Sequence, residues 1–523
     1  MKSRKLIYIL FCIFISCKNK NTEFTVQDGL VISNITVISP ANGSFKPYIG
    51  HVITDANSIV YAGKDLPVVK GNFQKIDGQG KYLIPGLIDS HVHLANIAGM
   101  NNQDRKKHPE LAAAYFEQLP KSFLYFGYTT LIDVNNYAPQ LINKIKSSPV
   151  SPDIFACGEQ VQVMDDFMME MEAYPRDERY GLPFLYDKYN KNISIPDSVN
   201  LTEHSAKTVI TNIAKQQEGF CVKTLYEDET SGLKQSWQLP TKEIMLELVK
   251  EAHAQNMPVI LHAPSYKGQK FALETGVDII AHAMWNWTGN PAELIKTEMP
   301  EMHQKLLLQI ANKKIGYQPT LRAILAEIDI MNNSFGSDPL LDQVYPKNFL
   351  AWLKTDAAPR AREKIMNRAK YLKVVNPEFY KAVRSSFESD EQMFTELYKL
   401  LKIKAEKVTR LMAGNNANLL FSTDGVAMNM YTNPPGYNGF LEMNHWLQAG
   451  VSLEKILLAA TVNNARAFKI DHLYGTIEAG KKANTLIMNA NPLESINAYN
   501  EIDVIIIKGK AVKRNALSAQ AKK

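Results

Sequence analysis

Two histidines separated by one residue, His91 and His93, have a spacing at which both side chains could bind one metal ion. They follow residues 83–90, a mainly apolar run typical of a buried strand. Residues two apart in a strand point to the same side, so two imidazoles at this spacing can hold one ion. Most His-x-His pairs are incidental, however, and a metal site is predicted only where further ligands accompany the pair.

Two more histidines and an aspartate occupy the same kind of position. Each stands where an apolar strand gives way to a loop: His262 after residues 258–261, His282 after residues 278–281, and Asp424 after residues 419–423. A single histidine there usually has a structural role, and an aspartate often caps the following helix. Several together at one rim favour a metal site, and neutral imidazole suits zinc and other transition ions. Asp424 could bind the metal and take a proton from its water.

Lys223 follows the predicted strand 220–222 and would bring a lysine to the same rim. A protonated amine cannot coordinate a metal, but its reaction product with carbon dioxide is an anionic carbamate that could bridge two ions. The alternatives are a substrate-binding cation or a surface lysine. Tyr226 and Arg322 lie just past strand ends and could contact substrate, Arg322 by pairing with a carboxylate. For both, a structural role is the commoner one at a barrel rim.

The elements that would position these residues follow the alternation of a parallel β/α architecture. Candidate strands lie at residues 87–88, 130–132, 154–156, 220–222, 259–261, 279–281, 315–317 and 419–421. Eight strands close a (β/α)8 TIM-like barrel, whose catalytic groups lie at the C-terminal strand ends. The long insertions 161–215 and 327–390, the second charged and helical in pattern, are expected to shape the mouth of that barrel.

The two ends of the chain have a different pattern, with short alternating strands and turns. Residues 24–82 and 471–512 predict one small β-sandwich-like domain built from both ends, with the barrel, residues 83–470, inserted in its sequence. Residues 513–523 are expected to form a frayed basic tail.

Residues 1–16 have the features of an export signal, because basic residues precede the apolar run 6–15. That run is shorter than the roughly 20 residues that span a bilayer. Ser16 before Cys17 resembles the bacterial lipobox, although Phe14 stands where leucine is usual. We therefore expect an exported protein that is held to the membrane only by a lipid on Cys17, with residues 17–23 as a linker. A plain signal peptide cut nearby is the alternative.

Composition limits the remaining possibilities. The formal net charge of +6 on 523 residues is small, so nucleic acid is not an expected partner. The hydrophobic share of 45% allows a large core and excludes a disordered chain. Cys157 and Cys221 would remain in the mature protein, either as one disulfide or as two buried thiols. Nothing in the sequence indicates the oligomeric state.

The motifs around the candidate ligands resemble those of the amidohydrolase superfamily. YLIPGLIDSHVHL at residues 82–94 is similar to its opening signature. FGYTTLIDV, MPVILHA, GVDIIAHA, IGYQPTLRA, LLFSTDG, LAATVNNARAF and YGTIEAGKKANTLIM follow in the order seen in its imidazolonepropionase-like branch. The resemblance extends from Gly29 to Lys510. Asn484 stands where the family usually has aspartate, at a structural position, and the two insertions match no subgroup.

The resemblance implies a site and a reaction. Five residues fall on the family's metal and proton-transfer positions: His91, His93, His262, His282 and Asp424. Lys223 falls on the carboxylated lysine of prolidase-like members, which implies two zinc ions bridged by that carbamate.

The reaction this resemblance implies is hydrolysis of an amide or cyclic amide C–N bond by a metal-bound hydroxide. The leading small-molecule substrate is a dipeptide or an N-acyl amino acid. The alternatives are an ester or lactone hydrolase, a metal-dependent decarboxylase or isomerase, and an inactive binding lipoprotein.

Overall fold

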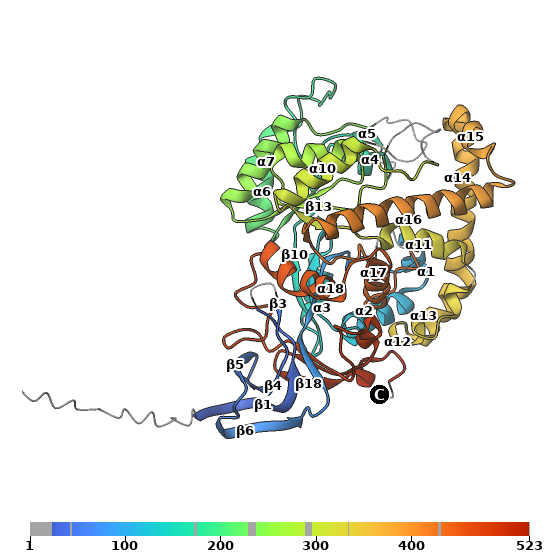
Figure 1. Cartoon of the computed structure of the whole chain (residues 1–523). Coiled ribbons are helices and arrows are strands. Elements are labelled where there is room, and N and C mark those ends of the chain that lie inside the picture. The colour runs from blue at the N-terminus through green and yellow to red at the C-terminus, as the bar shows by residue number, and fades with distance from the viewer. Residues whose placement is uncertain are drawn as a thin grey trace, which may run out of the picture.

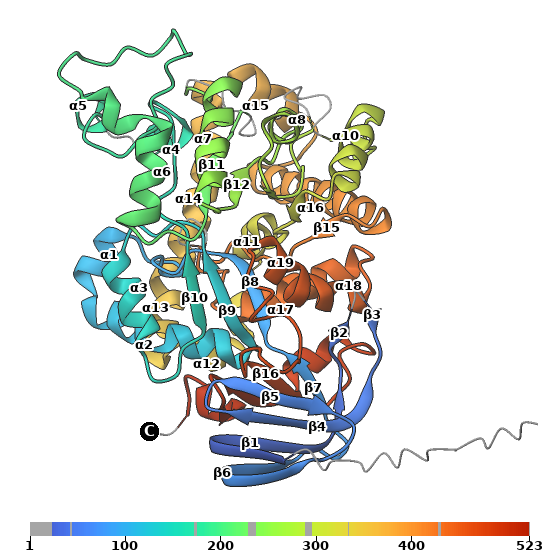
Figure 2. The same ribbon diagram turned by 90° about the vertical axis from the view of Figure 1, so that its left-hand side faces the viewer.

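The centre of the molecule is a barrel of parallel strands surrounded by helices (Figures 1 and 2). The structure is a computed structural model that describes residues 23–41, 44–171, 175–228, 237–287, 295–332, 334–426 and 430–521, so the predicted export signal and Cys17 lie outside it. Eight barrel strands occur within the described residues: β8 (Leu87–Val92), β9 (Tyr128–Asp133), β10 (Asp153–Ala156), β11 (Val222–Leu225), β12 (Val259–His262), β13 (Ile279–Ala281), β14 (Gly316–Gln318) and β15 (Asn418–Leu419).

Backbone hydrogen bonds close the barrel at two seams. The strands form two parallel sheets, in the orders β10-β9-β8 and β11-β12-β13-β14-β15. At the first seam, the amide of Asp424 donates to the carbonyl of His91 at 2.9 Å. At the second, Val161 donates to the carbonyl of Lys223 at 2.8 Å. The predicted fold class, a TIM-like barrel with an additional β domain, is confirmed.

The two-residue period of the strands separates an inner set of side chains from an outer set. Ile88, Ile260 and Leu420 pack together inside the barrel. Leu261, which lies between Ile260 and His262 in β12, belongs instead to the core under the helices. His262 is therefore on the inner side of its strand, and the same alternation brings Lys223, two residues after Cys221, and Asp424, four residues after Leu420, toward the barrel axis.

Strands from both ends of the chain form one eight-stranded sheet below the barrel (Figure 2). Its members are β1 (Glu23–Val37), β4 (Tyr48–Asp55), β5 (Ser58–Gly63), β6 (Val68–Asp77), β7 (Tyr82–Pro85), β16 (Thr485–Met488), β17 (Ile502–Ile507) and β18 (Lys510–Lys513), and β2 (Pro40–Ala41) pairs β3 (Ser44–Phe45) outside it. β7 joins the two ends because it pairs with both β1 and β16.

The chain passes from this sheet to the barrel at Gly86, a few residues later than the sequence pattern indicates. A Cβ atom at Gly86 would lie 2.0 Å from the Oγ1 of Thr129, so only glycine fits there. Residues 83–85 belong to the small sheet although they are as apolar as a barrel strand, because β7 is buried between its neighbours.

The expectation of a frayed C-terminal tail is wrong for residues 513–521. Arg514 donates from Nε to the carbonyl of Tyr125 at 2.8 Å, and its guanidinium lies over the ring of that tyrosine. Leu517 is buried, and Ser518 bonds to the side chain of Gln343 at 2.8 Å. The basic composition of the segment conceals these specific contacts with the barrel helices.

Helices cover the barrel, and several begin at a hydroxyl cap such as Thr241, Ser265 or Ser389. The main ones are α2 (Pro109–Tyr125), α3 (Pro139–Lys146), α6 (Ala206–Lys215), α7 (Lys242–Ala254), α8 (Tyr266–Thr275), α10 (Glu301–Asn312), α11 (Arg322–Met331), α16 (Asp390–Gly414), α17 (Tyr437–Gln448), α18 (Leu453–Leu458) and α19 (Asn464–Ala467). Among the described residues, no helix combines the length and the apolar character needed to cross a bilayer.

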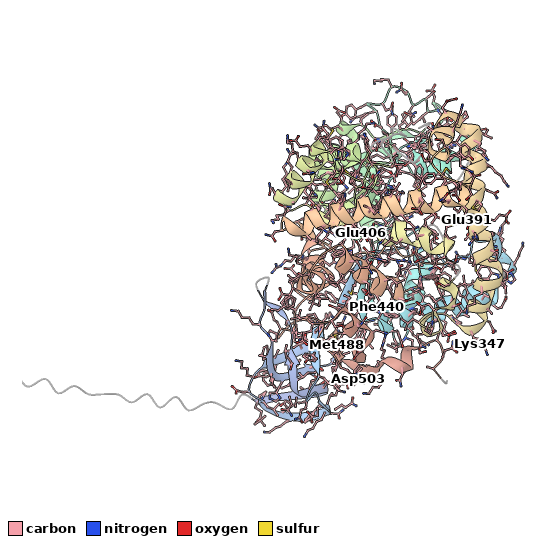
Figure 3. All side chains as sticks on the ribbon, turned by 45° about the vertical axis from the view of Figure 1, so that its right-hand side comes forward. Lys347, Glu391, Glu406, Phe440, Met488 and Asp503 are labelled. Atoms are coloured by element: carbon pink, nitrogen blue, oxygen red, sulfur yellow. A yellow bond between two sulfur atoms is a disulfide. The ribbon has the colours of Figure 1, made fainter. Side chains whose placement is uncertain are left out.

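The second insertion is helical, as its sequence pattern predicts. It contains α12 (Leu341–Val344), α13 (Lys347–Trp352), the π-helical turn η3 (Leu353–Ala357), α14 (Ala358–Val375) and α15 (Pro377–Arg384). Figure 3 marks this part of the molecule with Lys347 on α13 and shows Glu391 and Glu406 along the long helix α16 that follows. The first insertion contains α4 (Phe167–Met171) and α5 (Arg176–Arg179) before α6. A further short helix, α1 (Asn102–Lys107), lies in the loop after β8.

Cys157 and Cys221 form a disulfide inside the barrel. Both residues are fully buried among the inner side chains, at the seam between β10 and β11. The bond therefore crosslinks the two sheets where they are not joined by a regular ladder. Lys223 lies two residues after Cys221 on the same strand and the same side.

We expect the double variant Cys157→Ala/Cys221→Ala to be less stable than the native protein by about 4 kcal/mol, because the bond closes a loop with a sequence separation of 64 residues. Thermal denaturation with and without reductant measures the effect. In the native protein, both cysteines should react with iodoacetamide only after unfolding and reduction. Alkylation of both in denaturant alone would contradict the disulfide.

Candidate metal centre

The six residues predicted as metal ligands lie together at the C-terminal end of the barrel. His91 lies near the end of β8, and His93 lies directly beyond that strand. Lys223 lies in β11 and His262 ends β12. His282 follows β13, and Asp424 follows β15. Short contacts join them: Lys223 Nζ lies 3.2 Å from His91 Nε2, and the rings of His262 and His282 are 4.5 Å apart. The ring centroids of His91 and His282 are 5.6 Å apart, which connects the two groups.

His91, His93 and Asp424 form the tightest part of this cluster. Asp424 Oδ1 lies 3.2 Å from His91 Nε2 and 3.1 Å from His93 Nε2. The potential ligand atoms of all three residues lie within 4.8 Å of one another. Burial would raise the pKa of Asp424, but hydrogen bonds to the two histidines outweigh it and hold that pKa well below its usual value. The carboxylate is therefore ionised and able to coordinate.

Two of the imidazoles, those of His91 and His282, have lowered pKa values and are therefore held in the neutral form that binds metals. Burial, followed by the charge of Lys223, lowers the pKa of His91 to about 4. Burial and the neighbouring His262 lower the pKa of His282 well below its usual value. Neutral imidazoles and an ionised carboxylate form a donor set that suits a zinc-like ion.

Lys223 is buried and has an unusually acidic ammonium group. Burial lowers its pKa to about 8, although the charge of Asp424 acts in the opposite direction. About one tenth of this amine is therefore neutral at pH 7, far more than for an ordinary lysine. The neutral amine is the form that reacts with carbon dioxide to give a carbamate.

Polar residues around the cluster fix which ring nitrogen faces inward. Gln318 bonds His91 Nδ1 at 3.0 Å and Thr320 bonds His282 Nδ1 at 2.7 Å, so Nε2 of each ring is left to face an ion. Glu227 Oε2 lies 2.9 Å from His262 Nε2, which leaves Nδ1 of that ring. Such outer contacts orient metal-binding histidines in proteins.

Sequence reasoning missed these orienting residues. Gln318 and Thr320 are two residues apart within IGYQPTLRA, directly at the end of a predicted strand, and their polar character there was a usable signal. Glu227 lies in a loop after β11 without a recognisable pattern. Asp89 was also missed: it accepts hydrogen bonds from the amide and hydroxyl of Thr423 at 3.1 and 2.7 Å, and so holds the strand that leads to Asp424.

The two predicted substrate-binding residues lie in structural surroundings. Tyr226 packs against Phe271 of α8, with ring centroids 4.5 Å apart. Arg322 is 1% exposed, and its Nε, Nη1 and Nη2 donate to Asn438, Asp329 and the carbonyl of Thr432, respectively. These placements fit the structural role that the sequence also allowed for both residues.

A family model for amidohydrolases matches residues 82–282 and 361–512. These two ranges contain more than half of the chain and every candidate ligand, and the chain belongs to the amidohydrolase family. Residues 283–360, which include the first part of the second insertion, are not matched.

The chain is also similar to individual proteins of known name. It is 37% identical over 70 residues to an adenine deaminase of Clostridium perfringens, a match that covers 13% of this chain and only 12% of that protein. A Xaa-Pro dipeptidase structure superimposes with a TM-score of 0.57 at 20% identity, covering 93% of this chain and 100% of that one. Molinate hydrolase gives a TM-score of 0.60 at 17% identity, covering 94% and 96%. At these identities, the structural likeness shows the shared fold alone.

Removing the Arg322 guanidinium should affect stability rather than substrate binding. In Arg322→Met, the carboxylate of Asp329 and the amide oxygen of Asn438 lose their donor, so we expect a loss of about 3 kcal/mol. The drop in Tm measures it, and KM for any hydrolysed substrate should stay unchanged. A rise in KM at unchanged Tm would instead place Arg322 in the substrate site.

Proposed function

We propose that the protein is a metal-dependent hydrolase that cleaves an amide or cyclic amide C–N bond of a small molecule. The observation that carries this proposal is the cluster of His91, His93 and Asp424, whose ligand atoms lie within 4.8 Å of one another at the catalytic end of the barrel. Membership of the amidohydrolase family supports it. In a purely structural cluster, the carboxylate need not be ionised and the imidazoles need not be neutral. Here both kinds of group are in the forms that bind metals.

The residues present fit two divalent ions, which we propose to be zinc. His91, His93 and Asp424 would hold one ion, and His262 and His282 the other. Carboxylated Lys223 would bridge them, because its amine lies 3.2 Å from His91 Nε2 and its charge also acts on His282. When bound, the ions would supply Lewis acidity, which acidifies water and polarises a carbonyl oxygen.

In this proposal, Asp424 transfers a proton from the attacking water to the leaving nitrogen. Its carboxylate accepts a proton from water as the water oxygen forms a bond to the carbonyl carbon, and returns it to the nitrogen as the C–N bond breaks. The low pKa of Asp424 keeps the carboxylate ionised and ready to accept. The same low pKa makes Asp424 a weak base, so the water must be acidified for the transfer to proceed.

The proposed substrate class is a dipeptide or an N-acyl amino acid. The support is Lys223, the residue that resembles the carboxylated lysine of prolidase-like proteins, and the shared fold with a Xaa-Pro dipeptidase. A panel of amide, ester and lactone substrates with the same acyl group decides the bond type. Hydrolysis of the esters or lactones without hydrolysis of any amide would contradict the assignment to C–N bonds.

We expect Asp424→Asn to retain the metal and to lose about 10²- to 10⁴-fold in kcat, because the amide cannot accept the proton. Asp278→Asn is the matched control, since Asp278 also bonds a histidine, His253, at 2.9 Å, but on the surface. Metal analysis and steady-state kinetics on both variants measure the difference. Full activity of metal-loaded Asp424→Asn would exclude the proton-transfer role.

We expect two ions per chain in the native protein and one or none in Lys223→Met. Lys404→Met is the control for removing a buried lysine, because Lys404 is equally buried but lies over the ring of Trp287. Elemental analysis counts the ions, and a carbamate carbon signal after growth with ¹³C-bicarbonate detects the modification. One ion and an unmodified amine in the native protein would refute the two-metal site.

We further propose that the protein is exported and anchored by a lipid on Cys17. The basic and apolar residues before Cys17 support this, and the Cys157–Cys221 disulfide suits an oxidising compartment. Cells fed a labelled fatty acid should label the native protein but not Cys17→Ala, and the variant should leave the membrane fraction. Equal labelling of both would contradict lipidation at Cys17.

A further inference from the structure

A cavity of about 200 Å³ lies between the second insertion and the loops that follow β8 and β15. We call it the α14 cavity. The residues that matter for its chemistry are Gly99, Ile330, Arg360, Lys364, Arg368 and Met430. The volume is several times the roughly 30 Å³ that a water molecule takes up in the liquid, so the cavity holds one small organic molecule.

Three cationic side chains line the cavity from one face of α14. Arg360, Lys364 and Arg368 are spaced four residues apart, the spacing that stacks side chains along one side of a helix. Two of them are neutralised. Arg360 donates to both carboxylate oxygens of Asp104 at 3.1 and 2.8 Å, and Arg368 donates to both oxygens of Glu327 at 3.0 Å.

Lys364 is the cation that remains without a counter-charge. Among the described residues, no carboxylate lies within ion-pair distance of it, and its side chain is exposed to the cavity. The two arginine pairs on either side are bidentate, so Asp104 and Glu327 are fixed and do not swing toward Lys364. The cavity therefore has one uncompensated positive charge at a defined place.

Apart from Asn101 and Glu327, which is paired with Arg368, the rest of the lining is apolar. Ile330, Ile365 and Met430 are buried and contribute hydrocarbon or thioether surface, and Ala357 and Ala361 line the α14 side. A free inorganic anion would gain nothing from these residues. A small molecule with a carboxylate at one end and an apolar body would match both the charge and the surface.

The position of the cavity relates it to the metal centre. Gly99 lies in the loop that leaves β8 after His93, and Met430 lies in the segment that follows Asp424. Arg360 also donates to the carbonyl of Gly99 at 3.0 Å, which holds α14 against the first of these segments. The cavity is thus lined by a residue six positions after His93 and by another six positions after Asp424 in the chain.

We propose that the α14 cavity is a subsite for the carboxylate end of an otherwise apolar small molecule, with Lys364 as the residue that selects the negative charge. Its use as the acid-end subsite of the substrate rests on the proposed hydrolase function. Under that function, the cavity favours N-acyl amino acids and dipeptides with an apolar C-terminal residue.

Calorimetric titration with a pair of non-hydrolysable probes tests binding. The metal-loaded native protein should bind 3-methylbutanoate at least about tenfold more tightly than uncharged 3-methylbutanol, because only the carboxylate can make a charge-assisted contact with Lys364. Lys364→Ala should raise the Kd for 3-methylbutanoate about tenfold, and Lys364→Glu should raise it further. Lys370→Ala is the matched control, since Lys370 is exposed on the same helix outside the cavity. Equal Kd values in the native protein and Lys364→Ala, or equally tight binding of inorganic phosphate, would overturn the subsite.

Kinetics separate this proposal from the hydrolase function. The substrates are N-acetyl-L-leucine and N-(3-methylbutyl)acetamide, which lacks the carboxylate. Lys364→Ala should lower kcat/KM about tenfold for the first alone, through KM, and leave kcat unchanged. An equal loss for both substrates would overturn the subsite. No hydrolysis of either by the native protein would count against the proposed function, while the titration still decides the subsite.

Discussion

The candidate metal centre depends on the backbone pairing between β8 and the segment that follows β15. The amide of Asp424 donates to the carbonyl of His91 at 2.9 Å, and the amide of His93 donates to the carbonyl of Gly425 at 2.8 Å. These two bonds close the barrel and at the same time set Asp424 between the two imidazoles. Asp89 strengthens the pairing through Thr423. The fold and the site are therefore stabilised by the same contacts, and a shift in register would destroy both.

The charges gathered at this rim explain why the cluster suits metal ions better than a purely structural role. Lys223 and His91 are buried, and within the described part of the chain Asp424 is the anion whose charge acts on the Lys223 ammonium. Burial without full compensation is costly for a charged amine. In the proposed site, conversion to a carbamate would change the sign of that group and, with divalent ions, would turn a repulsive cluster into a mutually attractive one. Perturbed groups of this kind are typical of functional sites.

Local sequence patterns were sufficient for the barrel and for bringing the six candidate ligands to one end of it, because each of these residues directly follows or ends an apolar run. The orienting residue Glu227 and the ordered segment 513–521 could not be predicted, since both depend on contacts between distant parts of the chain. The Cys157–Cys221 bond is similar: the two thiols meet only after the barrel closes, so the sequence left two outcomes open. The place of residues 83–85 was missed because a buried central strand of the small sheet and a barrel strand have the same apolar pattern.

The barrel and the second insertion differ in which of their cationic side chains have partners. Arg322 connects α11 with Asn438 of α17 and with the carbonyl of Thr432, so it holds the mouth segments in place while its own donors are engaged. The barrel therefore supplies ligands and their support, and offers the substrate no cation at this position. The α14 face of the insertion carries the cation that is still uncompensated, Lys364. Substrate choice in this protein would then change through α14 without any alteration of the candidate metal ligands, because Arg360 and Arg368 of α14 bond to Gly99, Asp104, Glu327 and Tyr398, none of which is a candidate ligand.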